Sequence, residues 1–480
     1  MRTFQELADR WIAGGGEQLE DTDPADPSHV LAGFRLFTKH DAEAAVETAA
    51  SKFGEWSSTP APKRGAILLK AGEVMESMLE ELVELMTMEE GKTLADSRAE
   101  ISRSCAIFKF YGGLAYKYGG VTLPSSDADS RIMTFKEPVG VVAAITPWNF
   151  PSSIPAWKLA PALAAGDAVV FKPATKTPLI AARMLDALAA AGLPKGVLNL
   201  VVGRGGSVGD VLVSHKDVAA VSLTGSTSVG MRVHNLAGSK DTMSRVQLEL
   251  GGKNALYVDS DADVPLAADL AVRGAFGLTG QSCTATSRLI VHEGVAASLK
   301  EKLLERVKRW KVGPGNADGV NMGPVVDAEQ YRKDVEYIEV GKREGARLIH
   351  GDGGPPAGAG LYLGPSIFDD VSPGMRIFDE EIFGPVLSIT TVGSLDEAIG
   401  LINSVDYGHT AGIISRNFRS INLFIDRVQA GVIKVNKPTV GLELQAPFGG
   451  FKRSGAGTWK EMGEEALEFY TREKTVYMGY

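Results

Sequence analysis

The chain of 480 residues carries 59 acidic residues against 50 lysines and arginines, a formal net charge of -9 at pH 7. This acidic balance, with no basic run, disfavours a nucleic-acid-binding protein. No apolar stretch approaches the roughly 18 residues that suggest a membrane span, and the composition is typical of globular proteins. The length predicts two or three domains.

Helical periodicity dominates residues 41–118, and Gly91 provides a helix stop within that region. Short apolar runs then alternate with helical patterns over residues 168–250, which predicts parallel βαβ units. A second alternating block, residues 254–435, predicts a second α/β domain. The Gly- and Pro-rich stretch 351–360 is predicted to form a surface loop.

The chain has two cysteines, Cys105 and Cys283. Such sparse use argues against a disulfide framework and indicates a reducing compartment. The first 16 residues lack the apolar segment of a secretory signal, so we expect a cytoplasmic protein. Cys105 shares an apolar helical stripe with Ile101 and Phe108, and we predict that it lies in the core.

Glycine clusters follow two predicted strands of the first block. Gly205 and Gly209 lie in a cluster whose spacing is one residue longer than the usual dinucleotide fingerprint, so it is equally consistent with a packing role. Gly225 and Ser226 lie at a helix start, where backbone amides suit a nucleotide phosphate. An ordinary capped helix is the alternative. Met231 stands where a Walker A loop needs lysine.

Two segments carry candidate catalytic groups. Cys283 lies in a polar, glycine-flanked loop, a placement typical of a nucleophile rather than a core residue. Glu249 ends a predicted strand and is followed by two glycines after Leu250, which leave room for substrate and water beside a general base. None of the seven histidines has metal-ligand spacing, so we predict no metal.

Over nearly its whole length the sequence resembles the aldehyde dehydrogenase superfamily. The glutamate and the cysteine stand 283 − 249 = 34 residues apart, as in that family. The matching motifs, in the family's order, are Pro147-Trp148-Asn149-Phe150-Pro151, Phe171-Lys172-Pro173-Ala174, Thr224-Gly225-Ser226, Glu249-Leu250-Gly251-Gly252-Lys253, Gly280-Gln281-Ser282-Cys283, Glu381-Ile382-Phe383-Gly384-Pro385 and Pro447-Phe448-Gly449-Gly450.

The resemblance implies an α/β fold with a Rossmann-like cofactor domain, an α/β catalytic domain and a small β oligomerisation flap. Residues 1–120 and 140–248 would form the dinucleotide-binding domain, and residues 249–450 the catalytic domain. Residues 121–139 and 451–480 would form the flap. Because such a flap exposes a sheet edge that another subunit must cover, we expect a homodimer or homotetramer.

The family mechanism assigns roles to three residues. Cys283 would attack an aldehyde carbonyl, the Asn149 side-chain amide would stabilise the oxyanion together with the Cys283 N–H, and Glu249 would activate the water that hydrolyses the thioester. Lys172 would contact the adenosine ribose and Glu381 the nicotinamide ribose. The residues expected at the cofactor are Thr146, Pro147, Trp148, Lys172, Thr175, Gly205, Gly209, Gly225, Ser226, Leu250, Glu381 and Phe383.

Cofactor choice depends on the position three residues after Lys172. Relatives that prefer NAD commonly have a glutamate there, which binds the ribose hydroxyls and repels a 2′-phosphate. In this chain Thr175 occupies the position and Lys176 follows. We therefore expect NADP or NAD as cofactor, with NADP at least tolerated.

The substrate is expected to be a small aldehyde. Succinate semialdehyde dehydrogenases place an arginine at the position of Trp157, and the closer resemblance is to 2-oxoglutarate semialdehyde (2,5-dioxopentanoate) dehydrogenases. We predict a short polar semialdehyde, with glyceraldehyde or succinate semialdehyde as alternatives. No arginine is assigned to the carboxylate, and Trp157 and Leu442 suit an apolar substrate equally well. The residues predicted to contact the substrate are Ser153, Trp157, Ser282, Thr284 and Thr439.

Two other classes of protein were weighed. A CoA-acylating aldehyde dehydrogenase usually lacks the glutamate present here as Glu249. A binding or structural protein that kept only the fold would be expected to lose the nucleophile first, whereas Cys283, Asn149 and Glu249 are all present. The sequence therefore favours a non-acylating aldehyde dehydrogenase.

Overall fold

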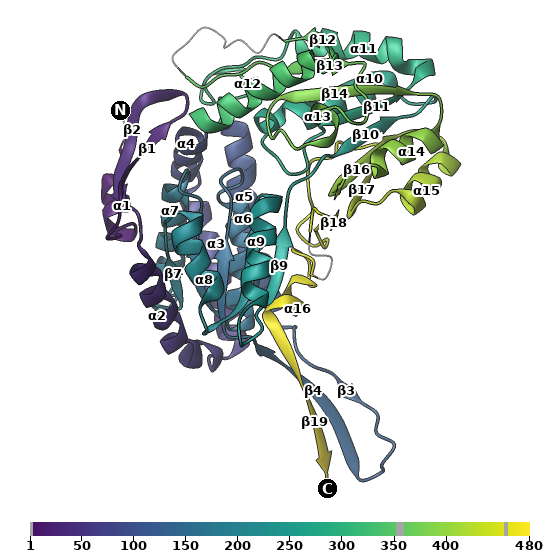
Figure 1. The fold of residues 1–480 in the computed structure, drawn as a ribbon. Helices are drawn as coiled ribbons and strands as arrows, with labels where there is room; N and C mark the ends of the chain where they lie inside the picture. The colour runs from purple at the N-terminus through teal and green to yellow at the C-terminus, as the bar shows by residue number, and fades with distance from the viewer. Residues whose placement is uncertain (1–2, 352–359, 456–458) are drawn as a thin grey trace.

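Two α/β lobes and a projecting β arm make up the computed structural model, which describes residues 3–351, 360–455 and 459–480 (Figure 1). The predicted surface loop at 351–360 lies outside the described residues except at its two ends. No helix in these ranges combines the length and the apolar character that crossing a membrane requires.

The N-terminal region is mainly helical, as predicted, but before the predicted helices it contains a short helix and a β hairpin that the sequence did not predict. Thr38 begins the first long helix with a reciprocal capping box to Asp41, and Gly91 ends the third at φ +94°. The elements are α1 Gln5–Trp11, β1 Gln18–Asp23, β2 Asp26–Arg35, α2 Lys39–Ser57, α3 Ala61–Ser77, α4 Leu79–Glu90 and α5 Leu94–Leu114.

The lower lobe contains a five-stranded parallel sheet in the order β7-β6-β5-β8-β9. Every residue of β5 and β6 is buried, as expected for central parallel strands covered on both faces. The strand order reverses at β5, so a ligand crevice is expected at the carboxyl ends. The elements are β5 Val141–Ile145, α6 Ser153–Ala165, β6 Ala168–Lys172, α7 Pro178–Ala190, β7 Leu198–Leu200, the π-helical turn Gly205–Gly209, α8 Asp210–Ser214, β8 Val218–Thr224, α9 Thr227–Gly238 and β9 Arg245–Glu249.

The upper lobe contains a seven-stranded sheet in the order β12-β13-β14-β11-β10-β16-β17, parallel except for the edge strand β12. It confirms the predicted second α/β block. Its elements are β10 Ala255–Val258, α10 Val264–Phe276, the 3-10 turn Gly277–Gly280, β11 Arg288–His292, α11 Glu293–Val307, α12 Ala328–Arg343, β12 Arg347–His350, β13 Ser366–Asp369, α13 Arg376–Asp379, β14 Val386–Val392, α14 Leu395–Asn403, β15 Tyr407–Gly408, β16 Thr410–Ile414, α15 Phe418–Arg427, β17 Val432–Val435 and β18 Phe451–Lys452.

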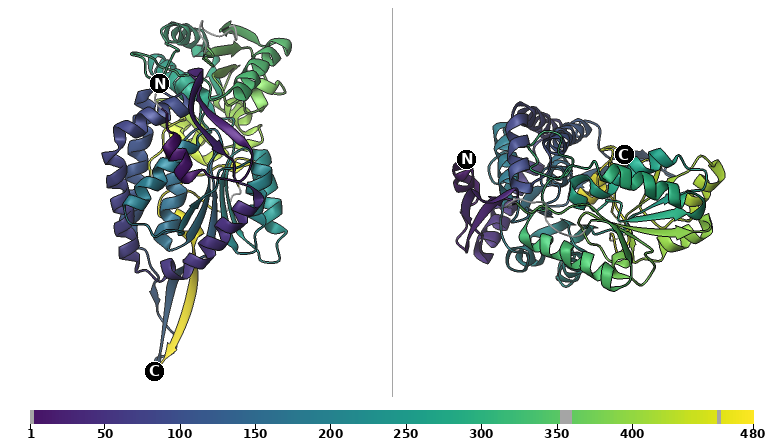
Figure 2. Two further views of the ribbon diagram at one scale, coloured as in Figure 1. Left: turned by 90° about the vertical axis from the view of Figure 1, so that its left-hand side faces the viewer. Right: turned by 90° about the horizontal axis from the view of Figure 1, so that it is seen from above.

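The arm is a three-stranded sheet, β19-β4-β3, formed by β3 Thr122–Leu123, β4 Ser130–Pro138 and β19 Thr471–Gly479. It projects away from both lobes in Figure 1 and in the side view of Figure 2. Residues 451–470 were expected to belong to this flap, but the described ones, 451–455 and 459–470, do not. The helix α16, Ala466–Tyr470, buries Leu467 and Phe469 in the core of the lower lobe, so the arm strand begins only at Thr471.

Candidate active site

Two cavities meet at Cys283. A cavity of about 320 Å³ and a second of about 180 Å³ both include this residue in their walls. Cys283 lies in the loop between the 3-10 turn that follows α10 and the start of β11, between the two lobes. The other cysteine, Cys105, is completely buried in the core, as the sequence predicted.

The Cys283 thiol lies in surroundings that favour its protonated form. Burial raises its pKa well above the ordinary value, and the negative charge of Glu249 raises it further, as does a hydrogen bond with the Glu249 side chain. The more distant carboxylates of Glu381 and Glu461 act in the same direction. A reaction at this sulfur therefore needs a base beside it.

Glu249 is the carboxylate that can serve as this base. It ends β9, is 1% exposed and lines the smaller cavity together with Cys283. Its Oε1 is hydrogen-bonded to Nε2 of His409, a residue that the sequence analysis did not single out. Ligand-type atoms of the glutamate, cysteine and histidine lie within 4.8 Å of one another. Because the carboxylate and the imidazole bond directly to each other, we assign no metal to them.

Asn149 follows β5 and lines the smaller cavity beside Cys283 and Glu249. Its Nδ2 donates to the carbonyl oxygen of Gln281, 3.0 Å away, in the loop that carries the cysteine. Its backbone carbonyl accepts from Lys92 Nζ at 2.8 Å. The side-chain amide is thus fixed, and Nδ2 retains a second N–H. The three predicted catalytic residues come together from the ends of two strands and one loop.

The smaller cavity opens at the carboxyl ends of β5, β8 and β9, where the sheet topology places a ligand crevice. Gly252 N donates to Glu381 Oε1 at 2.7 Å, and a Cβ on Gly251 would lie 2.3 Å from Glu381 Oε2. Only glycine allows this approach. Trp148 and Phe383 meet edge to face at 5.5 Å. The cofactor candidates in its wall are Pro147, Trp148, Gly225, Ser226, Leu250, Glu381 and Phe383.

Five other cofactor candidates lie outside the wall of that cavity. Thr146 N donates to the Lys172 carbonyl, and its buried Oγ1 has no hydrogen-bond partner among the described residues. A Cβ on Gly209 would lie 3.8 Å from the Lys172 side chain, so the first glycine cluster adjoins the end of β6. Thr175 is half-buried just beyond Lys172, and Gly205 begins the π-helical turn.

Burial lowers the pKa of Lys172 to about 8. Its ammonium donates only to the Pro173 carbonyl oxygen, 3.2 Å away, among the hydrogen bonds of the described chain. Lys176 is different: it forms an ion pair with Asp327 at 2.6 Å and lies 5.6 Å from the centre of the Trp148 ring. Of the two cations near Thr175, only Lys172 is left for an anionic ligand.

The buried, orphaned Thr146 hydroxyl and the glycine cradle at Gly251 fit a polar ligand such as a dinucleotide. The start of α9 fits one of its phosphates, because backbone amides face outward there and a Cβ on Gly225 would contact only Leu223 Cδ1, at 3.9 Å. The Ser226 hydroxyl caps this helix by accepting from Val229 N. The backbone amides, rather than this hydroxyl, are therefore the donors available to a phosphate.

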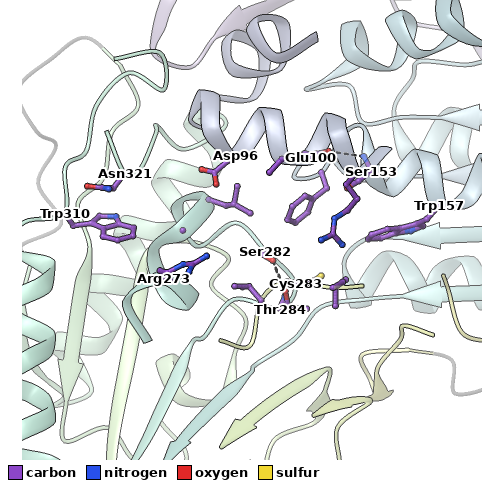
Figure 3. Close-up of a pocket in the computed structure, with 18 residues that line it drawn as sticks. Asp96, Glu100, Ser153, Trp157, Arg273, Ser282, Cys283, Thr284, Trp310 and Asn321 are labelled. Atoms are coloured by element: carbon purple, nitrogen blue, oxygen red, sulfur yellow. Dashed lines mark hydrogen bonds between the residues drawn. The ribbon is translucent and has the colours of Figure 1, made fainter. Parts of the chain in front are cut away.

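The larger cavity contains four of the five predicted substrate contacts: Ser153, Trp157, Ser282 and Thr284. In Figure 3, Ser282, Cys283 and Thr284 lie between Trp157 on one side and Arg273 and Trp310 on the other. The Ser282 and Thr284 hydroxyls are 3.1 Å apart. Phe150 and Leu442 add apolar surface to the wall.

Thr439 does not line the larger cavity, which corrects the sequence analysis. The side chain is completely buried. Its hydroxyl donates to the Thr284 carbonyl oxygen at 2.7 Å and lies 2.8 Å from Thr286 Oγ1. These bonds turn Thr439 away from the cavity, so it supports the Thr284 loop from behind.

In the larger cavity the carboxylates form hydrogen bonds within the described part of the protein, whereas the arginines do not. Asp96 accepts from Thr93 Oγ1 at 2.7 Å, and Glu100 accepts from Lys92 Nζ at 2.6 Å and from two backbone amides. Arg103 and Arg273 line the same cavity and form no hydrogen bond or ion pair with any described residue. Burial lowers the pKa of Arg103. Among the described residues, the cavity therefore has two arginines without a hydrogen-bonded partner and two carboxylates that already accept hydrogen bonds, although Glu443 and Glu100 act electrostatically on Arg103.

Comparison with known proteins now identifies the family. Residues 11–476 match the sequence profile of the Aldehyde dehydrogenase family. The chain belongs to this family. A solved structure of betaine aldehyde dehydrogenase from Staphylococcus aureus in complex with NAD+ superposes with a TM-score of 0.94 at 35% identity, covering 98% of this aldehyde dehydrogenase and 96% of the other chain. The predicted fold is thereby confirmed.

Two curated relatives match this aldehyde dehydrogenase over almost their full lengths. The 2,5-dioxopentanoate dehydrogenase of Saccharolobus solfataricus is 64% identical over 480 residues, with 100% of both chains covered. The alpha-ketoglutarate semialdehyde dehydrogenase of Haloferax volcanii is 46% identical, with 98% of both covered. The predicted subfamily resemblance is thus confirmed as a similarity.

Sequence reasoning missed three functional candidates in this aldehyde dehydrogenase: Arg103, Arg273 and His409. Arg103 lies one helical turn after Glu100 on α5, and Arg273 lies in the last turn of α10. Neither belongs to a motif. His409 follows the short strand β15 and reaches Glu249 across 160 residues of sequence. Only the tertiary structure brings these side chains to the site.

Proposed function

We propose that this protein oxidises 2,5-dioxopentanoate, which is 2-oxoglutarate semialdehyde, to 2-oxoglutarate with NAD or NADP as hydride acceptor. The observation that carries the proposal is the larger cavity, which ends at Cys283 and presents two unpaired arginines. The substrates named for the two curated relatives support the same choice.

The proposed chemistry begins with proton transfer. Glu249 takes the proton from the Cys283 thiol, and the sulfur forms a bond to the aldehyde carbon. The Asn149 amide and the Cys283 N–H donate to the resulting oxyanion, at a typical value of about 3 kcal/mol for each donor. A nicotinamide cofactor, when bound, accepts the hydride. Glu249 releases the thiol proton to solvent before it takes a second proton, from the water that displaces sulfur from the thioester. Water rather than CoA thus receives the acyl group, and the sulfur leaves as the thiolate.

The two arginines would recognise the distal carboxylate of the substrate. Arg103 approaches the cavity from α5 and Arg273 from α10, and neither forms a hydrogen bond or ion pair with a described residue, although the carboxylates of Glu443 and Glu100 act electrostatically on Arg103. A guanidinium binds a carboxylate with two parallel hydrogen bonds. An aldehyde without the carboxylate would leave these cations unpaired, which accounts for selectivity between substrates.

The remaining assignments belong to the same proposal. Thr175 and the unpaired Lys172 support acceptance of NADP as well as NAD. The lower lobe would bind the dinucleotide, and the upper lobe would supply Cys283. The arm exposes Phe135, Tyr477 and Met478 and has an unpaired edge on β19, which supports a homodimer or homotetramer. The two free thiols are consistent with the cytoplasm.

The test is a comparison of kcat/KM for 2,5-dioxopentanoate, succinate semialdehyde, glyceraldehyde, hexanal and benzaldehyde. We expect the first to be preferred. Arg103→Met and Arg273→Met should each lower kcat/KM for the two carboxylate substrates by about 10- to 100-fold, since hydrogen bonds to charged groups contribute about 1.5–3 kcal/mol. Activity on hexanal should change little.

Arg98→Met is the matched control, because Arg98 lies on the same helix but bonds to Glu80 at 2.6 Å on the surface. It should leave every substrate unaffected. A wild-type enzyme that favours hexanal or benzaldehyde over every polar aldehyde would contradict the proposed substrate. Equal losses on hexanal and on 2,5-dioxopentanoate in the Arg103 and Arg273 variants would contradict the carboxylate role.

A further inference from the structure

The hydrogen bond between His409 and Glu249 is the starting point. The imidazole is 1% exposed and the carboxylate is equally buried. The ring packs against Phe448, with centroids 5.0 Å apart, and the His409 backbone carbonyl accepts from Val432 N. Gly252 also lies close, since a Cβ placed on it would be 3.0 Å from the His409 Cβ. The histidine is therefore held by close packing and by its backbone.

The bond has a defined direction. A carboxylate only accepts hydrogen bonds, so the His409 Nε2 must carry the proton and donate to Glu249 Oε1. The other ring nitrogen, Nδ1, is buried without a hydrogen-bond partner among the described residues. All of the ring's hydrogen bonding is thus directed at the catalytic carboxylate.

We infer that His409 is a positioning residue that holds the Glu249 carboxylate toward Cys283 and toward the water that hydrolyses the thioester. The carboxylate is bonded on one side to the imidazole and on the other to the Cys283 thiol. Without the imidazole, a buried carboxylate that also faces the charges of Glu381 and Glu461 would keep no hydrogen-bond donor among the described side chains except the Cys283 thiol. Its side chain would then be free to turn away from the sulfur.

The two half-reactions should depend differently on this support. The thiol is covalently attached to the loop beside Glu249, whereas the hydrolytic water is oriented by the carboxylate alone. In that step a C–O bond forms as the C–S bond breaks, and the water's proton passes to Glu249. Loss of the histidine should therefore slow hydrolysis more than the first hydride transfer, because small misplacements of a base are costly.

The test compares His409→Leu, which removes the donor, with His409→Gln, which keeps an N–H donor. Rapid mixing of enzyme, NAD and aldehyde should give His409→Leu a burst of about one reduced cofactor per site, followed by turnover about 10- to 100-fold slower than wild type. KM for the aldehyde should stay within about threefold of wild type. His409→Gln should recover most of the rate. Glu249→Gln provides the reference for complete loss of the base.

Hydroxylamine adds a readout that a purely structural role would not affect. It attacks the thioester through its own nitrogen, forms a hydroxamate and returns the thiol without needing a positioned base. We expect it to restore turnover in His409→Leu. His234→Leu, at an exposed position on α9, is the control for losing a histidine. Wild-type turnover in His409→Leu, or equal impairment of both His409 variants without rescue, would overturn the inference.

The inference rests on the aldehyde dehydrogenase chemistry of the proposed function but not on its particular substrate. Any aldehyde that the wild-type enzyme oxidises can be used. Failure of the wild type to oxidise any aldehyde would count against the proposed function, whereas normal hydrolysis by His409→Leu would count against the role of His409 alone.

Discussion

The two cavities that share Cys283 are built in different ways. The smaller one is lined by short motifs at strand ends, such as Trp148-Asn149, Gly225-Ser226 and Glu249-Leu250-Gly251. The larger one is assembled from α5, α10 and loops far apart in sequence, and its arginines are 273 − 103 = 170 residues apart. The motif residues of the smaller cavity and four of the five predicted substrate contacts could be recognised from the sequence, whereas Arg103 and Arg273 became visible only in the folded molecule.

We expect the largest loss of activity from a substitution of Cys283, the residue that lines both cavities. Cys283→Ala should lower aldehyde oxidation by on the order of 10⁴-fold or more, because it removes the group that bonds to the substrate. Binding of NAD, measured by calorimetry, should persist. Cys105→Ala is the matched control and should retain activity, since Cys105 is buried in the core away from both cavities.

Alkylation gives the corresponding pH dependence. Because the pKa of Cys283 is raised, its thiolate fraction at neutral pH is below that of an ordinary thiol and grows as pH rises. The rate of inactivation by iodoacetamide should therefore be slow at pH 7 and still increase above pH 9. Inactivation that modifies Cys105 instead, or a rate independent of pH over this range, would contradict the assignment.

A smaller effect is expected at the cofactor. Thr175→Glu should shift preference from NADP toward NAD by at least about 1 kcal/mol, roughly fivefold in the ratio of kcat/KM values, because the new carboxylate would repel a 2′-phosphate. Thr175→Gln is the control of similar size without charge. Absence of any NADP activity in the unmodified enzyme would exclude the expected role of Thr175.

The smallest expected effect on specificity is at Thr439. Thr439→Val removes hydrogen bonds to Thr284 and Thr286 behind the cavity wall, so the free energy of unfolding should fall by about 1–3 kcal/mol. Relative kcat/KM values across the aldehydes should stay within about twofold. A change in kcat/KM for one aldehyde alone would show that Thr439 does contact the substrate.

Much of the fold was predictable because it follows from local periodicity. The apolar runs that predicted parallel βαβ units over residues 168–250 correspond to real strands, of which β8 is one, because strands of a parallel sheet are buried on both faces. The β1–β2 hairpin was missed because its buried residues alternate irregularly around a register shift. The predicted flap boundary at residue 451 was wrong because Leu467 and Phe469 are buried by tertiary packing.

Some residues of the site could likewise be predicted from the sequence, and others could not. Cys283, Glu249 and Asn149 were identified from motifs, and the structure brings all three together. Thr439 was misplaced because its position in sequence does not reveal the direction of its side chain. His409 was overlooked because a single histidine after a short strand carries no signal until Glu249 is placed beside it.

The two cavities share Cys283 but differ in their other catalytic residues, and this difference has a consequence for the order of steps in a catalytic cycle. Among the described residues, Glu249 lines the smaller cavity and is absent from the wall of the larger one. Glu249 would therefore act on a water inside the smaller cavity, which is the cavity proposed to bind the dinucleotide. A bound reduced cofactor and the hydrolytic water would then compete for the same space, so added reduced cofactor should prolong the lifetime of the acyl-enzyme.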